Sequence, residues 1–594
     1  MKTDRLLLGF SVLMALALPT LAQDDAKPTP DSRLQKTVTI SGTHILLSEL
    51  LAKVEQQTGV SLKADTESKA WKVRELPVSV EVKDATLEDF QRQLAKLLDL
   101  RWARSGAEGG WVYTLWQDKN ARGREASALT ASAVTQQQKV EKQWTAIGDE
   151  LAKLAEMTPE EIKQAAKDNP FIDFISTNPF GKAYGNLLSS LAPAALPDIT
   201  SGQPFRAPYD SLSSGQQKAV QTYMNGMTEI QRRMTKKNQG ETFSGDWGKT
   251  AVVFRPMPQG PGHQIMDKLG LIGFLEVSGA GDAGKFNFPI VEPKSQMASL
   301  VATGFAKVQS GQSVDSVMKD VGTAIDEFLR TSTDREATSD AEGKSPTDQL
   351  DLKLLAGVDL KPKTPTDLGA ALADLTEKPG INIYAESWKQ PGMSIRPDKG
   401  TAAEVITRAS KSFGMTWDYE PSSARIRADN WAERRAAMVS QESIKYWTDL
   451  IDKKGALNLD DLAAMAGEFT REQMMTLMTS EEKIASNAWP LIAPDRRTAI
   501  LFYASLPTDQ VKRLRSAQGL SVNGLSGDVR ASLLGVVQAR GISADDFFVD
   551  GATVRLTETS EAGAKMVFAY PPDKTTEITL LRPAPAPKPA PAKG

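Results

Sequence analysis

The segment TVTISGTHILLSELLAKVEQQTGVSL, residues 37–62, decides the fold of the front of this chain. Val38 and Ile40 alternate with polar residues, which predicts a short strand. The next apolar residues recur at steps of three and four, which predicts a helix with one buried face; they are Leu47, Leu50, Leu51 and Val54. Gly59 is expected to end this helix in the left-handed conformation, and Val60 and Leu62 begin the next strand.

The residues that follow complete a small module over 37–118. Val78, Val80 and Val82 alternate with polar residues, which predicts a strand with one inward face. A second helix has a buried stripe, which consists of Leu87, Phe90, Leu94, Leu97 and Leu98. A hairpin from Trp102 to Trp116, with a glycine-rich turn, then closes the sheet. The predicted order is strand, helix, strand, strand, helix and hairpin.

Tryptophan positions indicate an internal duplication. Trp102 and Trp116 recur as Trp417 and Trp431, each 315 positions later. Two further pairs are Trp71 with Trp388 and Trp144 with Trp447. Helix-start signals recur too: Thr86-x-x-Asp89 returns as Thr401-x-x-Glu404, a spacing that lets a hydroxyl cap a free N–H while the acid reaches back.

The predicted fold class is therefore α+β, with two tandem copies of a unit made of a small βαββαββ module, a helical segment and a short antiparallel sheet. Leu196-Pro197 and Leu506-Pro507 are expected to separate helices, and three strands are expected to end each copy. The predicted divisions are a signal peptide (1–22), a linker (23–36), the first module (37–118), its helical and sheet region (127–291), helices and a polar linker (292–349), the second module (350–431), its helical and sheet region (432–582) and a Pro/Ala-rich tail (583–594).

Residues 1–22 have the three parts of a secretory signal. Lys2 and Arg5 precede an apolar run from Leu6 to Leu18, and a small-residue cleavage site ends at Ala22. This run is shorter than the ~20 residues that a spanning helix needs. We therefore expect cleavage after Ala22, no integral membrane segment afterwards, and a periplasmic or extracellular protein.

Charge and cysteine content exclude several classes of function. Removal of the signal takes away two positive charges and one negative charge, which changes the net charge from −3 to −4. Such a weakly acidic chain does not attract nucleic acid. The chain has no cysteine, which excludes disulfides, a lipoprotein anchor, thiolate zinc sites and cysteine nucleophiles.

No motif in the sequence predicts a catalytic, cofactor-binding or metal-binding residue. Gly279-x-Gly281-x-x-Gly284 matches the letters of a dinucleotide fingerprint, but a strand rather than a helix is expected to follow, which favours a hairpin turn. His44, at the expected start of the first helix, and His263, in a loop, are expected to have surface or capping roles.

Carboxylate pairs and tryptophans remain as candidates. Asp545-Asp546 and Glu160-Glu161 are acid pairs that a glycosidase could use, although solvated helix faces explain such pairs as well. The recurring tryptophans are expected in the core. Trp111 has no counterpart in the second copy and is the candidate for an exposed contact.

The spacing in both copies resembles the N-terminal periplasmic domain of secretins, which is similar to the short signalling domain of TonB-dependent receptors. The matching features are Leu47-x-x-x-Leu51-x-x-Val54-x-x-x-x-Gly59, Thr86-Leu87-Glu88-Asp89, Leu100 and Trp102 in the first copy, and Leu368, Leu372, Gly380, Thr401, Glu404 and Trp417 in the second. The resemblance implies a domain that contacts other proteins. The chain has no long series of alternating strands for a secretin gate or a barrel.

These observations favour an exported interaction or scaffold protein of the cell envelope, which binds other envelope proteins through sheet-edge or groove contacts. On this hypothesis the chain is not an enzyme and holds no cofactor. One alternative is a secreted hydrolase of cell-wall or polysaccharide material that uses a carboxylate pair. Another is an accessory component of a secretin or pilus apparatus, which the resemblance suggests.

Overall fold

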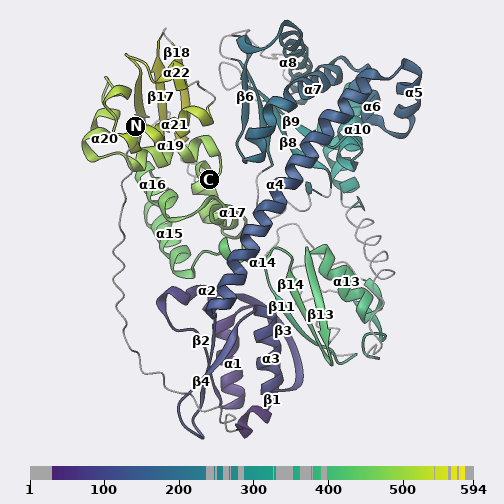
Figure 1. Cartoon of the computed structure of the whole chain (residues 1–594), viewed down its shortest axis with the longest axis vertical. Helices are drawn as coiled ribbons and strands as arrows, with labels where there is room; N and C mark the ends of the chain where they lie inside the picture. Colours follow the sequence, from purple (N-terminus) through teal and green to yellow (C-terminus); the bar gives the residue numbers. More distant parts are fainter. Residues whose placement is uncertain are drawn as a thin grey trace, which may run out of the picture.

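The structure is a computed structural model of the whole chain (Figure 1). It describes residues 30–235, 247, 250–257, 266–267, 269–278, 286–325, 327–328, 352–360, 376, 379–388, 398–540, 542, 544–559, 563–571 and 574–581. Several sequence predictions lie outside these residues; they concern the signal peptide, His263, the glycine fingerprint at 279–284, the polar linker, Leu368 and Leu372 of the resemblance, and the tail.

Residues 37–118 form module 1, and its elements follow the predicted order. They are β1 (Thr37–Leu46), α1 (Leu47–Thr58), β2 (Ser61–Ala64), α2 (Trp71–Arg74), β3 (Pro77–Thr86), α3 (Leu87–Leu98), β4 (Arg101–Ser105) and β5 (Val112–Trp116). β1 pairs antiparallel with β3, while β2, β5 and β4 form a second sheet in that order. α1 ends at Gly59 with φ +67°, as predicted.

The prediction for His44 is wrong. His44 lies in β1 and not at the start of a helix, because β1 continues to Leu46 through an irregularity between Gly42 and Ile45. A φ of +49° at His44 belongs to this irregularity, and its N–H donates to the Ser79 hydroxyl at 2.9 Å. The bulge adds residues to β1, and the apolar spacing of the following helix does not show where the strand ends.

Module 2 is formed by the described residues between 352 and 431. Its elements are β10 (Gly357–Leu360), β11 (Asn382–Glu386), β12 (Asp398–Thr401), α13 (Ala402–Ser412), β13 (Met415–Glu420) and β14 (Ser423–Ala428). β11 is parallel to β14, and β13 is antiparallel to it, which repeats the pairing of β2, β5 and β4. The two modules therefore share a strand order. Their common origin stays a prediction.

Each module is followed by a lobe of helices and one sheet. Lobe 1 contains α5 (Pro159–Asp168), α6 (Pro170–Thr177), α7 (Pro179–Thr200), β6 (Phe205–Pro208), α8 (Ser214–Thr235), β7 (Ala251–Pro256), β8 (Leu271–Ser278), β9 (Phe286–Val291) and α10 (Gln296–Gln309). The helix α4 (Lys119–Glu156) leads into it from module 1, and Figure 1 shows α4 crossing the molecule diagonally. Residues 314–325 are also helical.

Lobe 2 consists of short helices and one sheet. Its elements are α14 (Trp431–Ala436), α15 (Gln441–Lys454), α16 (Leu459–Glu468), α17 (Arg471–Ser480), α18 (Glu482–Ala488), α19 (Pro494–Ser505), α20 (Thr508–Leu514), β15 (Leu520–Ser521), α21 (Gly527–Ala539), α22 (Ala544–Phe547), β16 (Thr553–Thr559), β17 (Gly563–Tyr570) and β18 (Lys574–Leu581). Residues 431–454 form two helices and not one, because the Ser440 hydroxyl accepts the Ser443 N–H and so starts α15 anew.

Two further expectations about the lobes are wrong. Each sheet has four strands, since the short β6 and β15 pair at its edge. Leu196-Pro197 does not end a helix in lobe 1, because α7 runs on through Pro193 and Pro197 with Ala195 and Ile199 buried. Burial of this helix face outweighs the loss of hydrogen bonds at the prolines. In lobe 2, α19 does end at Ser505, before Leu506-Pro507.

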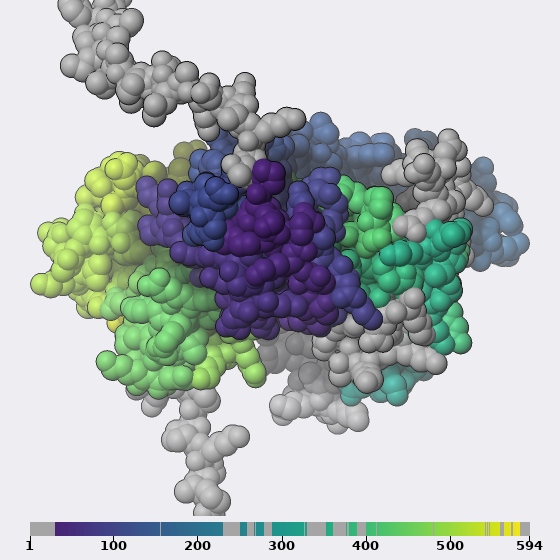
Figure 2. All heavy atoms as spheres, turned by 90° about the horizontal axis from the view of Figure 1, so that it is seen from below, coloured from purple at the N-terminus to yellow at the C-terminus, as the bar shows by residue number. Residues whose placement is uncertain are grey.

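Four buried apolar clusters hold these parts. Module 1 and module 2 each have one, and a larger one fills each lobe. Seen from below in Figure 2, module 1 (purple) forms the centre of the visible face, with residues of the second half on both sides. No helix within the described ranges combines the length and apolar content required to span a bilayer.

The close packing of α6 on α7 generates a stability prediction. A Cβ at Gly181 would lie 2.0 Å from the Phe174 carbonyl oxygen, whereas a Cβ at Gly185 would have an ordinary contact at 3.7 Å from Ile175. We expect Gly181→Ala to lower the free energy of unfolding by about 1–3 kcal/mol. The control Gly185→Ala should raise it by about 0.5–1 kcal/mol. Thermal denaturation distinguishes the two, and equal stabilities would contradict the packing described.

Candidate functional site

The two modules are joined into one sheet. β3 of module 1 pairs antiparallel with β11 of module 2, so that Ser79 faces Ala385 and Glu81 faces Ile383. The resulting sheet has the order β1-β3-β11-β14-β13, and Figure 1 shows these strands side by side at the base of the molecule. We call this joint, residues 77–81 and 383–387, the seam. It pairs two strand edges that would otherwise present free N–H and C=O groups.

Polar contacts fix the register of the seam. The three hydrogen bonds run from the Lys83 N–H to Asn382 Oδ1 (2.9 Å), from the Thr376 hydroxyl to the Glu81 carbonyl (3.3 Å) and from the Ser387 N–H to the Pro77 carbonyl (3.0 Å). Asn382 and Thr376 are both buried. A slip of one residue would break these bonds and turn the buried side chains to the wrong face.

Tyr384 anchors module 2 in the core of module 1. The ring is fully buried in the cluster of module 1, and its centroid lies 6.0 Å from that of Phe90 on α3. Burial raises the pKa of Tyr384 far above its ordinary value, so the side chain is neutral at any physiological pH. Its neighbours Ile383 and Ala385 face the core of module 2, which means that β11 is buried on both sides.

A buried ion pair closes one end of the seam. Glu386, at the end of β11, is 1% exposed, and Arg435 on α14 is 3% exposed. Arg435 Nη2 donates to Glu386 Oε1 at 3.0 Å and to the Leu98 carbonyl of α3 at 2.9 Å. Arg427 Nε lies 3.5 Å from the same carboxylate, and Trp388 Nε1 donates to it at 3.1 Å. These contacts link module 1, module 2 and the start of lobe 2.

A second charged cluster lies at the opposite side of the joint. Glu420 on β13 accepts hydrogen bonds from Lys96 and Gln93 of α3, and Arg425 Nη1 lies 3.1 Å from Glu420 Oε1. Burial by itself raises the pKa of Glu420, but the bonds from Lys96 and Arg425 and the charge of Arg425 hold it at about 2. The carboxylate therefore stays ionised, and it ties module 2 to α3 throughout the neutral and mildly acidic range.

Trp111 lies in the hairpin of β4 and β5 in module 1. It is half-buried just before β5, and the Arg104 guanidinium carbon is 4.5 Å from the centroid of its ring. The Trp111 carbonyl accepts from Arg33 Nη2 at 3.1 Å. Arg104 belongs to β4, the outer strand of the sheet β2-β5-β4. The predicted contact residue thus lies next to the outer strand β4 through its contact with Arg104.

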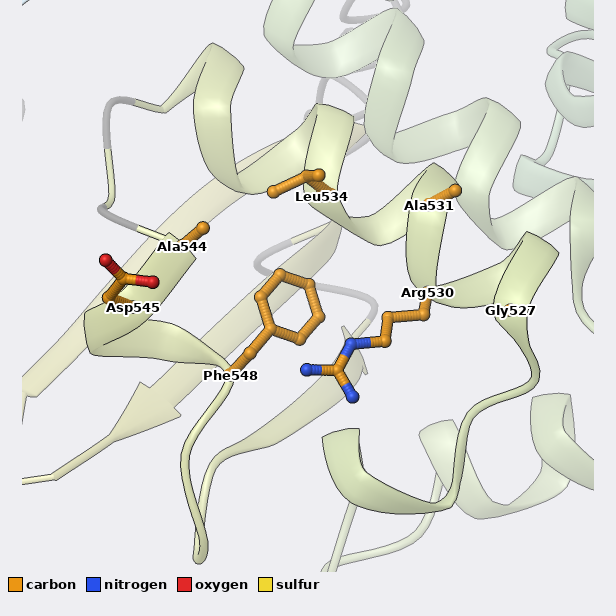
Figure 3. Close-up of a pocket in the computed structure, with 7 residues that line it drawn as sticks. All are labelled: Gly527, Arg530, Ala531, Leu534, Ala544, Asp545 and Phe548. Carbon is orange, nitrogen blue, oxygen red and sulfur yellow. The ribbon is translucent and has the colours of Figure 1, made fainter. Parts of the chain in front are cut away.

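One of the carboxylates named from the sequence, Asp545, lines a pocket in lobe 2. This pocket of about 500 Å³ is lined by Gly527, Arg530, Ala531, Leu534, Ala544, Asp545 and Phe548. The Arg530 guanidinium lies 4.7 Å from the Phe548 ring centroid, and Asp545 lies on the far side of that ring (Figure 3). Asp545 is the one carboxylate among the described side chains of this lining, and the Asp546 side chain lies outside those described.

The other candidate residues have structural roles. Glu160 lies in the first turn of α5, and Glu161 closes a capping box with Thr158. Trp102 Nε1 donates to the Gln91 carbonyl at 2.8 Å, and Trp417 Nε1 donates to the Thr407 hydroxyl at 3.0 Å, so that each ties its hairpin to the preceding helix. In the part of the chain that the structure describes, no group of three or more His, Asp or Glu side chains has a metal-binding arrangement.

The seam was not among the sequence predictions, although one signal for it is present in the sequence. Residues 381–385 read INIYA, a nearly continuous apolar run, and all five residues of β11 are buried. Such a run is typical of a strand that is covered on both faces. Val78, Ser79 and Val80 in β3 are likewise buried in succession. A run of this kind in each module indicates two strands that are covered on both faces and paired on both edges.

A disulfide tests the register of the seam, because the chain has no native cysteine. Facing residues in an antiparallel pair have Cα atoms about 4.5–5.5 Å apart, within the range of a disulfide. We expect Ser79→Cys with Ala385→Cys to cross-link under mild oxidation and to change mobility in non-reducing electrophoresis. In the control, Ser79→Cys with Ala424→Cys, the second cysteine is one strand further away and two residues along it, at more than about 9–10 Å, and should stay reduced. Equal cross-linking of both pairs would contradict the register.

The ion pair at Glu386 generates a stability prediction. Glu386→Gln removes the charge that the buried Arg435 and the half-buried Arg427 share, and we expect a loss of about 3–5 kcal/mol in the free energy of unfolding. Joint replacement by Glu386→Leu and Arg435→Met should recover a large part of this loss. Asp449→Asn is the matched control, since Lys445 and Asp449 form an exposed pair and should contribute less than about 1 kcal/mol. If urea denaturation shows a larger loss of stability for Asp449→Asn than for Glu386→Gln, that result contradicts this role.

Comparisons with known proteins do not add to this geometry. No family model, no curated protein and no solved structure matches the chain. The features that bear on function are the seam, the outer strand β4 next to Trp111 and the arrangement of the lobes. The resemblance to secretin N-terminal domains stays a proposal.

Proposed function

We propose that this chain is an exported interaction or scaffold protein of the cell envelope, whose modules bind other proteins by strand addition. The seam is the observation that carries this proposal: there one module recognises the edge of the other through backbone pairing and a few buried polar contacts. Strand addition between proteins uses the same physics, in which main-chain hydrogen bonds supply affinity and neighbouring side chains supply specificity.

The edge of β4 is the proposed docking site for a partner protein. β4 pairs with β5 without a register shift, and Arg101, Ala103 and Ser105 are exposed along it. By contrast, β1 has two irregularities, a feature that discourages further pairing. Arg104 of β4 lies over the ring of Trp111, and Trp and Arg are residue types that often anchor a protein interface.

The arrangement of the lobes supports a scaffold role. The seam makes one base from the two modules, and α4 would extend about 57 Å at 1.5 Å per residue from this base into lobe 1. Each lobe has its own buried core. The predicted signal peptide supports export, and the resemblance to secretin N-terminal domains favours a partner in a secretin or pilus apparatus.

Photo-crosslinking in the source cells tests this proposal. A photoreactive amino acid at Ala103 should give adducts of discrete mass with an envelope protein, whereas one at Asn186, an exposed position on α7, should not. Trp111→Ala should lower the adduct yield by about tenfold or more, since a central aromatic anchor contributes about 2 kcal/mol or more. A thermal melt of the same variant checks that the module stays folded. Adducts no more frequent at Ala103 than at Asn186 would overturn the proposal.

A further inference from the structure

The outer strands β4 and β13 occupy corresponding places in the two modules. β4 follows α3 and β13 follows α13, and each pairs with the next strand of its hairpin without a register shift. Trp102 and Trp417 lie at equivalent positions in them, since each indole bonds back to the preceding helix. Neither strand has a second neighbour among the described residues. Figure 1 shows β4 on the left and β13 on the right of the base, so the two strands of one chain do not meet.

The backbone of β4 points to its outer side at Trp102. The Asp65 N–H donates to the Leu115 carbonyl at 2.9 Å, so Leu115 directs its backbone groups toward β2. Leu115 therefore does not bond to β4, and its facing residue Trp102 lies in a non-hydrogen-bonded pair of that ladder. The N–H and C=O groups of Trp102 thus point away from β5, to the side where a further strand would lie.

The backbone of β13 points to its outer side at Trp417. The Asp429 N–H donates to the Gly414 carbonyl at 3.0 Å, which makes these two residues a hydrogen-bonded pair. Because such pairs alternate with non-hydrogen-bonded pairs along an antiparallel ladder, Trp417 lies in a non-hydrogen-bonded pair with Ile426. Its N–H and C=O groups thus point away from β14. The two strands can therefore form an antiparallel ladder in which Trp102 faces Trp417.

The two outer strands have opposite charges. β4 contains Arg101 and Arg104, whereas β13 contains Asp418 and Glu420. Two copies of β4 side by side would bring arginines together, and two copies of β13 would bring carboxylates together. Like charges that face each other destabilise a ladder, whereas opposite charges stabilise it. The charges therefore favour a ladder between one β4 and one β13.

Arg101 and Asp418 are accessible for such a contact, since their side chains are 61% and 65% exposed. Each also has an ion-pair partner in its own chain. Arg101 Nε lies 2.7 Å from Asp118 Oδ2, and Arg425 Nε lies 2.8 Å from Asp418 Oδ1. A guanidinium has several N–H donors and a carboxylate has several acceptor sites, so both groups can bind a further partner.

We propose that β4 of one copy of this chain pairs antiparallel with β13 of a second copy, with Trp102 opposite Trp417. Arg101 then lies opposite Asp418, with Cβ atoms about 4.5–5.5 Å apart. Because the two strands lie at opposite sides of the base, the contact is head-to-tail and continues into a ring or a filament. This inference rests on the proposed function, since it names a second copy as a partner at the β4 edge.

A disulfide between copies tests the register, because the chain has no native cysteine. In the proposed ladder Ala103 lies opposite Thr416, and both residues are exposed. We expect Ala103→Cys with Thr416→Cys to form dimers and longer series under mild oxidation, visible in non-reducing electrophoresis. Ala103→Cys with Asn186→Cys, at an exposed position on α7, is the control and should stay monomeric. Equal cross-linking of both pairs, or none in the first, would overturn the inference.

Charge reversal in the full mature chain tests the pairing of Arg101 with Asp418. The molar mass of the wild type, measured by light scattering after size exclusion, should rise with concentration. Arg101→Glu and Asp418→Lys should each weaken association about tenfold, since like charges then face each other. An equimolar mixture of the two variants should associate again, because each altered strand then finds one of opposite charge. Lys63→Glu, an equal change at an exposed position of the outer strand β2, is the control and should associate like the wild type.

The mixture separates a lost contact from a misfolded variant, because only folded chains recover association when mixed. A wild type that stays monomeric at every concentration would overturn the inference, and so would association that Lys63→Glu weakens equally or that neither variant changes. In a dilute monomer, residues 101–105 remain an outer strand, so their amide exchange should slow only as association begins. A monomeric wild type with adducts from Ala103 to a different envelope protein would leave the proposed function intact, so the two failures are distinguishable.

Discussion

Backbone pairing between β3 and β11 is the constraint on which the arrangement of this protein depends. The two strands are about 300 residues apart in the chain, yet each is a central strand of one sheet. The N–H and C=O groups of a strand edge in water form hydrogen bonds with water. An edge that is buried among apolar side chains needs another strand to pair with. Since the Tyr384 ring lies in the core of module 1, backbone pairing and side-chain burial both stabilise the contact between the modules.

The joint also positions the lobes. Arg435 follows directly from module 2, contacts Glu386, and lies 3.9 Å from Glu125 on α4. Glu433 accepts a hydrogen bond from Ser132, further along α4. The α4 helix therefore rests against the start of lobe 2 while it leads into lobe 1. If the modules separated, these contacts would have no fixed geometry, and the base of the scaffold would become two linked bodies.

Much of the modules could be predicted from the sequence because their signals are local. The stripe on α3, the caps at Thr86 and Thr401 and the glycine after α1 each depend on residues within one or two turns. The seam depends on a register between distant edges, which periodicity does not encode. The lobes show the same limit: α7 continues through Pro197 because tertiary burial outweighs the local signal.

The same contrast between local signals and contacts of distant strands applies to the candidate site. Trp111 was predicted as a contact from the absence of a repeat partner, but its position beside Arg104 at the edge of β4 requires the fold. No motif in the sequence marks Asn382 and Thr376, because their roles appear only when the two strands of the seam lie side by side. Residues that act through the backbone of a neighbouring strand leave no motif.

Hydrogen–deuterium exchange of the full chain tests the central claim most directly, because it reports pairing at individual strands. Peptides that cover residues 78–81 and 382–386 should exchange as slowly as those of a strand with neighbours on both sides, and much more slowly than residues 101–105 of the outer strand β4. Exchange of 382–386 at the rate of an outer strand would show that the modules are not joined and would contradict the account.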